Sequence, residues 1–231
     1  MCRGRNATAK LQEEKTRSNA IIIRKREEPA SWTLIQTLAR EGKLGELLQV
    51  GDELKCQLKT GEDVTFEVAD MREHPCFVLK DCMKDEKPMN KQMTNAGGWR
   101  DSFMREWLNG TIFHMMPDAL QEIIVPRTIR QTLDGTVVET EDKLWLPSYT
   151  EMFGKEGAEA WAPADTGDEQ FQLYTSEKNR VKEQGEHGTW WYWLRSPLGS
   201  DSTYFCYVNS VGNANGNAAS YSCGVAFGFC L

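Results

Sequence analysis

The sequence predicts an α+β fold with short antiparallel strands, two or more helices and long C-terminal loops. Three observations lead to this class. Residues 53–58 and 64–69 alternate apolar with polar side chains around a short turn, which predicts a β-hairpin. Residues 99–113 carry apolar side chains at helical spacing. Residues 190–231 combine aromatic side chains with Ser, Asn and Gly, which is typical of short strands joined by polar loops.

The N-terminal residues differ from the rest in charge. Residues 1–28 contain eight Lys or Arg and four Glu, a net charge of +4. We expect a basic N-terminal arm that is either mobile or bound to a partner, and that could carry a homo-oligomer contact. Its apolar patch, residues 20–23, is compatible with a docking strand or with an oligomer contact. Residues 29–231 are predicted to form one domain.

A helix is predicted over residues 31–48, where five leucines fall near helical spacing and Ser31 is a plausible N-cap. Gly42 and Gly45 weaken its second half. Strands follow at residues 53–58 and 64–69, and Val64, Phe66 and Val68 should share a buried face. A third strand is predicted over residues 75–82, where Phe77 and Val78 favour β-structure.

The strongest helical pattern covers residues 99–113. Trp99, Phe103 and Trp107 form one row, and Met104, Leu108 and Ile112 form a second. We interpret both rows as core. A short helix is expected at residues 118–124, and an extended segment at residues 125–132, because Pro126 prevents continuation of the helix.

The next segment contains a local helix-start motif. Ser148 and Glu151 have the spacing of a capping box, so a short helix should begin at Ser148, directly after a buried strand end at residues 144–146. Residues 154–168 are predicted to be loop. Residues 169–182 are predicted to form an amphipathic helix that contains Phe171 and Leu173.

Charge and hydropathy exclude several classes of function. The formal net charge of −7 argues against nucleic acid or an anionic membrane as the main partner. No apolar run is long enough for a transmembrane helix. The first ten residues do not have the apolar stretch of a secretory signal, so we expect a cytoplasmic protein as synthesised.

The sequence does not suggest a catalytic or metal centre. The seven cysteines have irregular spacing and no C-x-x-C pair, so we expect reduced thiols that pack as small hydrophobic side chains. The three histidines are isolated. We expect Glu141 and Asp142 to be solvated, and Arg195 to be structural, stacked or paired with a carboxylate. The prediction is therefore no cofactor, no metal and no catalysis.

The C-terminal composition is that of a binding face. Of the 26 residues from 198 to 223, fifteen are Ser, Asn, Gly or Tyr, and Asp201 is the one charged side chain from Leu198 to the end. Tyrosine offers broad contact with little rotamer entropy to lose, and Ser, Asn and Gly adapt their hydrogen bonds. The alternative is a low-complexity loop. A loop of that kind does not require aromatic residues such as Trp190 and Phe229 at its ends.

The same residues carry a resemblance. The run WLRSP…FCYVNSVGNAN…ASYSCGVAFGFCL resembles the C-terminal variable region of proteins diversified by retroelements in bacteria and their phages. VLKDC, TNAGGWRDSFMREWLN, MPDALQEII and EDKLWLPSYTEMFG resemble the fixed part of that family. The resemblance extends from the first hairpin to the C-terminus.

This resemblance implies a C-type-lectin-like fold with a variable region over residues 190–231. The implied fixed positions are Trp191, Trp193, Arg195, Ser196, Pro197, Phe205, Val208, Gly212, Ala214, Gly224, Val225 and Phe227. The implied variable, ligand-binding positions are Ser200, Asp201, Ser202, Thr203, Tyr204, Tyr207, Ser210, Val211, Gly216, Asn217, Ala218, Tyr221 and Cys223. Calcium binding is not implied, because one Asp cannot supply the carboxylate cluster that calcium needs.

We therefore expect a non-catalytic display protein that binds an unknown protein or surface ligand. Its Tyr, Ser and Asn side chains, above all Tyr204, Tyr207 and Tyr221, should project from one face. One alternative is a cysteine-dependent oxidase related to the formylglycine-generating enzymes, with Cys223 and Cys230 as candidates. Another is a structural phage component, possible if the protein is virion-associated, with residues 1–28 as its attachment element.

Overall fold

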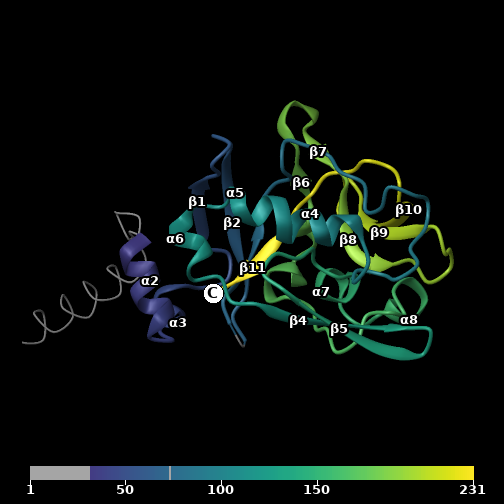
Figure 1. Cartoon of the computed structure of the whole chain (residues 1–231), viewed down its shortest axis with the longest axis horizontal. Helices are drawn as coiled ribbons and strands as arrows, with labels where there is room; N and C mark the ends of the chain where they lie inside the picture. The colour runs from purple at the N-terminus through teal and green to yellow at the C-terminus, as the bar shows by residue number, and fades with distance from the viewer. Residues whose placement is uncertain (1–31, 73) are drawn as a thin grey trace, which may run out of the picture. The chain divides into compact units, whose positions relative to one another are not determined.

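The computed structural model describes residues 32–72 and 74–231 (Figure 1). The chain divides into two units, residues 1–35 and 36–231. The predicted basic arm, residues 1–28, lies outside the described residues. Every strand named below belongs to the second unit.

The second unit contains both short helices and antiparallel strands, so the predicted α+β class is confirmed. The α-helices are α2 (Trp32–Arg40), which begins in the first unit, α3 (Leu44–Leu47), α4 (Phe103–Trp107), α5 (Phe113–Met115), α6 (Asp118–Gln121), α7 (Tyr149–Phe153) and α8 (Ala158–Trp161). A π-helical turn, η1 (Leu108–Ile112), joins α4 to α5. Three 3-10 helices follow, η2 (Gln172–Thr175), η3 (Glu177–Arg180) and η4 (Gly185–His187).

The strands are short and form four sheets. They are β1 (Glu53–Gln57), β2 (Asp63–Asp70), β3 (Cys76–Leu79), β4 (Arg127–Leu133), β5 (Thr136–Asp142), β6 (Lys182–Glu183), β7 (Thr189–Trp190), β8 (Tyr192–Pro197), β9 (Tyr204–Val208), β10 (Ala214–Ala218) and β11 (Gly228–Cys230). Among the described residues, no helix combines the length and the apolar character needed to cross a membrane.

The largest sheet has the order β1-β2-β3-β11 and is antiparallel throughout. It confirms the three strands predicted in this region. Val64, Phe66 and Val68 are buried on one face, as their alternation predicted. The last strand, β11, pairs with β3, so the C-terminus completes a sheet that begins with β1 (Figure 1).

Aromatic side chains from distant parts of the chain pack against this sheet. The ring of Phe66 contacts those of Phe227 and Phe229 at centroid distances of 5.5 and 4.9 Å. Phe77 stacks on Phe229 at 5.2 Å. Burial of such rings stabilises the fold by about 1.5–3 kcal/mol each. The core therefore fixes the C-terminal strand to the first hairpin.

Two predicted helices differ from the structure, because one is interrupted and the other begins later than predicted. The predicted helix 31–48 is interrupted at Gly42, whose φ of 67° is left-handed, and becomes α2 and α3. The predicted helix 99–113 begins only at Phe103, because Gly97 and Gly98 adopt positive φ and the Ser102 side chain caps α4. The row Met104, Leu108 and Ile112 is buried as predicted, whereas Phe103 and Trp107 are half-buried.

The prediction of an amphipathic helix over residues 169–182 is wrong. Two 3-10 helices, η2 and η3, occupy this segment. Tertiary contacts explain the difference: the Gln170 side chain donates to the carbonyls of Met152 and Tyr174 at 3.2 and 3.1 Å, and the Gln172 backbone donates to Asp70 at 3.3 Å. The predicted loop 154–168 also contains a short helix, α8.

Asp142, which we expected to be solvated, is fully buried. Its carboxylate accepts hydrogen bonds from Trp99 Nε1 at 2.9 Å, Arg105 Nε at 2.6 Å and the Thr140 hydroxyl at 2.6 Å. Three donors can replace the water that the carboxylate loses on burial. Its neighbour Glu141 is exposed, as predicted.

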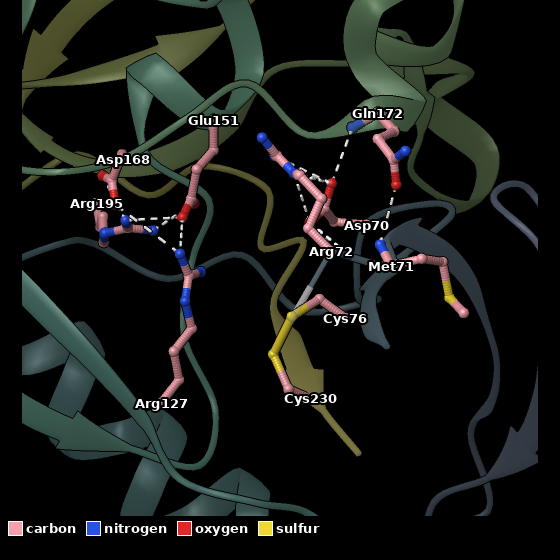
Figure 2. The surroundings of a disulfide bond; sticks show 10 residues. All are labelled: Asp70, Met71, Arg72, Cys76, Arg127, Glu151, Asp168, Gln172, Arg195 and Cys230. Carbon is pink, nitrogen blue, oxygen red and sulfur yellow. Dashed lines mark hydrogen bonds and ion pairs between the residues drawn. A yellow bond between two sulfur atoms is a disulfide. The ribbon is translucent and has the colours of Figure 1, made fainter. Parts of the chain in front are cut away.

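The prediction that the cysteines are reduced thiols is wrong for two of them. Cys76 and Cys230 form a disulfide between β3 and β11 (Figure 2). They are direct partners in the antiparallel register, with their Cα atoms 4.2 Å apart. Their separation of 154 residues in the sequence gave no sign of this pairing. Cys56, Cys82, Cys206 and Cys223 are free thiols.

Candidate ligand-binding surface

The C-terminal part of the chain is built on a three-stranded antiparallel sheet in the order β10-β9-β8 (Figure 1). Residues 198–203 join β8 to β9 at one end of this sheet, and residues 209–213 join β9 to β10 at the other end. Residues 219–227 follow β10 and lead to β11. The several short strands predicted for the C-terminal part of the chain are confirmed.

Strand β8 is held by a buried charge network. Arg195 is fully buried and donates from Nη1 to Glu151 at 2.6 Å and to the carbonyl of Leu146 at 2.8 Å. Its Nη2 donates to Asp168 at 2.6 Å. The predicted role of Arg195 as a structural arginine paired with carboxylates is confirmed (Figure 2).

Glu151 belongs both to this network and to the predicted capping box. The Ser148 hydroxyl accepts from Glu151 N at 3.0 Å, and the Glu151 carboxylate accepts from Ser148 N at 2.9 Å, so the capping box is confirmed. Burial alone would raise the pKa of Glu151, but Arg127 and Arg195 outweigh burial and lower it to about 2. The carboxylate is therefore ionised and joins α7 to β8.

A second acid holds the next residue of β8. The Ser196 hydroxyl lies 2.7 and 2.8 Å from the two carboxylate oxygens of Asp165 and accepts from Tyr149 N at 2.8 Å. Burial and the neighbouring Asp168 raise the pKa of Asp165 to about 7. Both Arg195 and Ser196 are thus fixed by side chains that lie outside the C-terminal part of the chain.

The loop 198–203 is held in a different way. The Asn95 side chain donates from Nδ2 to the carbonyls of Asp201 and Tyr204 at 2.8 and 2.7 Å, and lies 3.4 Å from that of Leu198. Asn95 N also donates to the carbonyl of Ser202 at 2.8 Å. All of these contacts are made to backbone atoms. Inside the loop, the Asp201 carboxylate also accepts from Thr203 N and Oγ1 at 2.8 and 2.5 Å. The loop can therefore keep its path when Ser200 and Ser202 change, because none of these bonds uses their side chains.

The segment after β10 is anchored in the same manner. Ala219 N donates to the carbonyl of Thr203 at 2.9 Å, and Asn90 N donates to the carbonyl of Ala219 at 2.9 Å. The Asn90 side chain accepts from Phe103 N at 3.0 Å, which links this segment to α4. Residues 90–95 therefore lie along both the 198–203 loop and the segment that follows β10.

The thirteen predicted ligand-binding residues differ in exposure. Five are exposed, namely Ser200, Ser202, Ser210, Val211 and Tyr221. Five are half-buried, namely Asp201, Thr203, Tyr204, Gly216 and Asn217. Three are buried and cannot present a side chain to a ligand in this structure, namely Tyr207, Ala218 and Cys223.

Two of the three buried residues have clear packing partners, and the third, Ala218, is 4% exposed. The Tyr207 ring packs edge-on against Trp191 and Trp193 at centroid distances of 5.4 and 6.3 Å, and 8% of the residue is exposed. Burial also raises the pKa of its hydroxyl. The Cys223 thiol donates to the carbonyl of Trp191 at 3.3 Å. These residues belong to the core, which corrects their predicted exposure.

The prediction that Tyr204, Tyr207 and Tyr221 project from one face is also wrong. On β9, Tyr204 is opposite Ala218 and Tyr207 is opposite Asn215, in an uninterrupted register. Side chains alternate between the two faces of a strand, so residues three apart point in opposite directions. Tyr221 lies beyond β10, with 61% of the residue exposed.

The exposed residues separate into two groups because the sheet is antiparallel. Ser210 and Val211 lie in the turn between β9 and β10. The 198–203 loop and the residues after β10 lie at the other end of the sheet. We define the tail-loop surface by the exposed residues Ser200, Ser202 and Tyr221, together with Met93 from the adjoining 90–95 segment.

Met93, Asn90 and Asn95 were not among the predicted site residues. Met93 is 58% exposed on a segment whose two ends bond to Ala219 and Ser202. A signal was present in the sequence, because Asn and Thr next to two glycines favour a side chain that bonds to backbone. This signal does not predict which distant loop accepts the hydrogen bonds.

The described residues contain no cluster of three or more His, Cys, Asp or Glu side chains that could hold a metal ion. The thiols do not form the pair that a cysteine-dependent oxidase would use, because Cys230 is bonded to Cys76. Burial raises the pKa of Cys206 and of Cys223 well above the usual range. Both thiols donate to carbonyls, those of Trp161 and Trp191.

Comparison with known proteins gives one match. A family model described as a domain of unknown function, DUF6273, matches residues 73–231. The match includes the buried charge network, both cysteines of the disulfide and the tail-loop surface. No curated protein and no solved structure matches the chain.

Proposed function

The chain belongs to the DUF6273 family, a domain of unknown function, and we propose that it is a non-catalytic ligand-binding protein. The binding site is the tail-loop surface. The partner is a protein or another surface ligand that contacts loops rather than entering a deep cleft.

One observation carries this proposal. The loop 198–203 is fixed through its carbonyl groups by Asn95, whereas Ser200 and Ser202 are exposed. Backbone anchoring separates the shape of the loop from the identity of these two serines. Binding residues are commonly found on loops that a rigid scaffold positions, and exposed substitutions usually change stability by no more than about 0.5 kcal/mol.

The chemistry of the surface supports a protein-like partner. Tyr221 and Met93 are 61% and 58% exposed, which is high for large apolar side chains. Tyrosine and methionine are enriched at interfaces. The neighbouring serines can donate and accept hydrogen bonds with little loss of conformational entropy.

We further propose that the fold is C-type-lectin-like and that a retroelement diversifies exposed positions of residues 190–231. The resemblance of the WLRSP and GVAFGFCL runs supports this origin. The test is at the nucleotide level. A near-copy of the coding stretch beside a reverse-transcriptase gene should differ from it only at adenines, and differences spread over all four bases would contradict this origin.

The ligand-binding proposal can be tested by display of two libraries. The first randomises Ser200, Ser202, Tyr221 and Met93. The matched second library randomises four fully buried residues, Phe205, Val208, Val225 and Phe227. Protease resistance measures folding, and selection against lysozyme as a soluble protein probe measures binding.

We expect most members of the first library to resist protease and few members of the second. Selection should enrich lysozyme binders from the first library only. Equal protease sensitivity of the two libraries would contradict backbone anchoring. A well-folded first library that yields no binders would contradict the proposed use of this surface.

A further inference from the structure

A cavity of about 550 Å³ lies beside the disulfide and shares no lining residue with the tail-loop surface. Three segments of the chain contribute to its walls, through Asp70, Arg72, His74 and Cys76, through Pro126, Arg127, Thr128 and Arg130, and through residues 166–169 and Phe171, and Cys230 also lines it. Figure 2 shows Arg127 extending past the disulfide toward Glu151, with Arg72 on the other side. Cavities of this size commonly bind small molecules.

Most charged groups around the cavity already have partners. Arg72 Nε lies 3.0 and 3.1 Å from the Asp70 carboxylate oxygens, and Arg72 also pairs with Glu169. Arg130 donates to Glu139 at 2.7 Å. These pairs need no ligand.

Arg127 is the exception. Its Nη2 bonds to Glu151 and lies 3.8 Å from Asp168. Its Nη1 is buried and has no hydrogen-bond partner among the described residues. A buried donor without an acceptor costs about 1–3 kcal/mol, and more when the donor is charged. This cost would be offset by an acceptor oxygen.

The guanidinium of Arg127 cannot easily turn away to find water. It stacks on the rings of Trp145 and Phe171, with its Cζ atom 4.7 and 5.4 Å from their centroids. Nη2 is held by the buried Glu151. Two aromatic faces and one ion pair therefore fix the direction of Nη1 before any ligand arrives.

We propose that this cavity binds a small organic carboxylate, with one carboxylate oxygen accepting a hydrogen bond from Arg127 Nη1. A charge-assisted bond of this kind is stronger than a neutral one. Phe171, Pro126 and the disulfide provide apolar wall for the body of the ligand.

The charge around the cavity favours a monoanion. The lining that the structure describes contains three arginines (Arg72, Arg127 and Arg130), three acids (Asp70, Asp168 and Glu169) and His74, so the acids offset the arginines. A phosphate dianion would require surplus positive charge that these walls do not provide. A carboxylate brings one charge to Arg127 Nη1, a buried donor of the cavity lining that has no partner among the described residues.

The experiment titrates benzoate into the full chain and follows its binding through the backbone amide signals in NMR spectra. We expect a Kd of about 1 mM or tighter, with shifts at Thr166 and Gly167 on the cavity wall. Arg127→Lys keeps a positive charge for Glu151 but removes Nη1, and should weaken binding by about tenfold or more. The control Arg130→Gln changes a cavity arginine already paired with Glu139 and should change Kd by less than about twofold.

Methyl benzoate provides a test that needs no variant. It keeps the ring but has no charged oxygen, so it should bind at least about tenfold more weakly than benzoate to the unaltered protein. The proposal is overturned if benzoate does not bind, if its shifts lie away from the cavity, or if Arg127→Lys and methyl benzoate leave the affinity unchanged. It is also overturned if inorganic phosphate binds more tightly than benzoate.

Discussion

Two consecutive segments of the chain, β8 and the loop 198–203, are held by opposite means. In β8 every residue is buried, and the side chains of Arg195 and Ser196 make the bonds that fix the strand. In the loop, Asn95 bonds to backbone carbonyls, the Asp201 side chain bonds only within the loop, and the side chains of Ser200 and Ser202 are exposed. The path of β8 therefore depends on Arg195 and Ser196, whereas the path of the loop does not depend on its two serines.

This difference shows where sequence change can be tolerated. Replacing Arg195 or Ser196 of β8 removes a partner from buried acids. Replacing Ser200 or Ser202 removes no described contact to the scaffold. A protein that must vary its ligand contacts and keep its fold needs this separation, and the following predictions examine it from the largest expected effect to the smallest.

Arg195→Ala should have the largest effect. It removes one of the two cations that Glu151 and Asp168 share and leaves them with Arg127 alone, and breaking a buried ion pair costs about 3–5 kcal/mol. Urea unfolding measures the loss. The matched control is Arg130→Ala, whose pair with Glu139 is about half exposed on both sides and should cost less than about 1 kcal/mol. Similar losses for the two variants would contradict a structural role for the buried network.

Removal of the disulfide should come next. The Cys76→Ala, Cys230→Ala double variant opens a loop of 154 residues, and loss of a native disulfide typically costs about 2–5 kcal/mol. Cys56→Ala, at a free half-buried thiol on β1, is the control and should change the free energy of unfolding far less. An unchanged midpoint in the double variant, or no effect of a reductant on the unaltered protein, would show that the bond does not stabilise the fold.

The stability of the scaffold should depend on pH through Asp165. Its pKa is about 7 in the folded protein and near 3.8 when solvated. The folded state therefore keeps a proton that the unfolded state loses, and stability falls as pH rises from about 4 to 7. The slope is at most about 1.4 kcal/mol per pH unit for one proton. Urea unfolding across this range checks the sign.

Asp165→Asn should reduce that slope, because an amide does not titrate, while Asp168 and Glu67, whose pKa values burial also raises, keep their share of it. Glu151 acts in the opposite direction: its pKa is about 2 in the folded protein and 4.5 when solvated, so its contribution is lost as pH falls through this interval. A variant that retains the full slope between about pH 4 and 7 would assign the dependence to another group.

Asn95→Ala should have a smaller effect that is confined to the loop. It removes the side-chain donor to the carbonyls of Asp201 and Tyr204, which keep Tyr204 N and Leu198 N as backbone donors, so the cost should be about 0.5–1.5 kcal/mol. Amide hydrogen exchange should accelerate in residues 198–204 more than in β8. Asn213→Ala, at an exposed position in the β9–β10 turn, should leave this exchange unchanged. Equal exchange in both variants would show that Asn95 does not anchor the loop.

Local chemistry explains what the sequence predicted correctly. The capping box of Ser148 and Glu151 needs only residues three apart. The first hairpin needs only alternation and a short turn. The pairing of Arg195 with carboxylates follows from the cost of burying an arginine alone.

Other features depend on contacts between distant residues. The partner of Cys76 is 154 residues away, and the bonds that divide residues 169–182 into two 3-10 helices come from Asp70, Met152 and Tyr174. The position of Tyr207 is different, because the sequence contained the signal. Tyr204 and Tyr207 are three residues apart on a strand, and a period of two places them on opposite faces.

The central claim is that the tail-loop surface does not contribute to the stability of its scaffold. The most direct measurement is the free energy of unfolding of a variant with Ser200, Ser202, Tyr221 and Met93 all changed to alanine, beside the single variant Phe205→Ala. We expect a loss of no more than about 1 kcal/mol for the four exposed changes together and about 3–5 kcal/mol for the fully buried Phe205. A fourfold variant that loses as much stability as Phe205→Ala would contradict the claim.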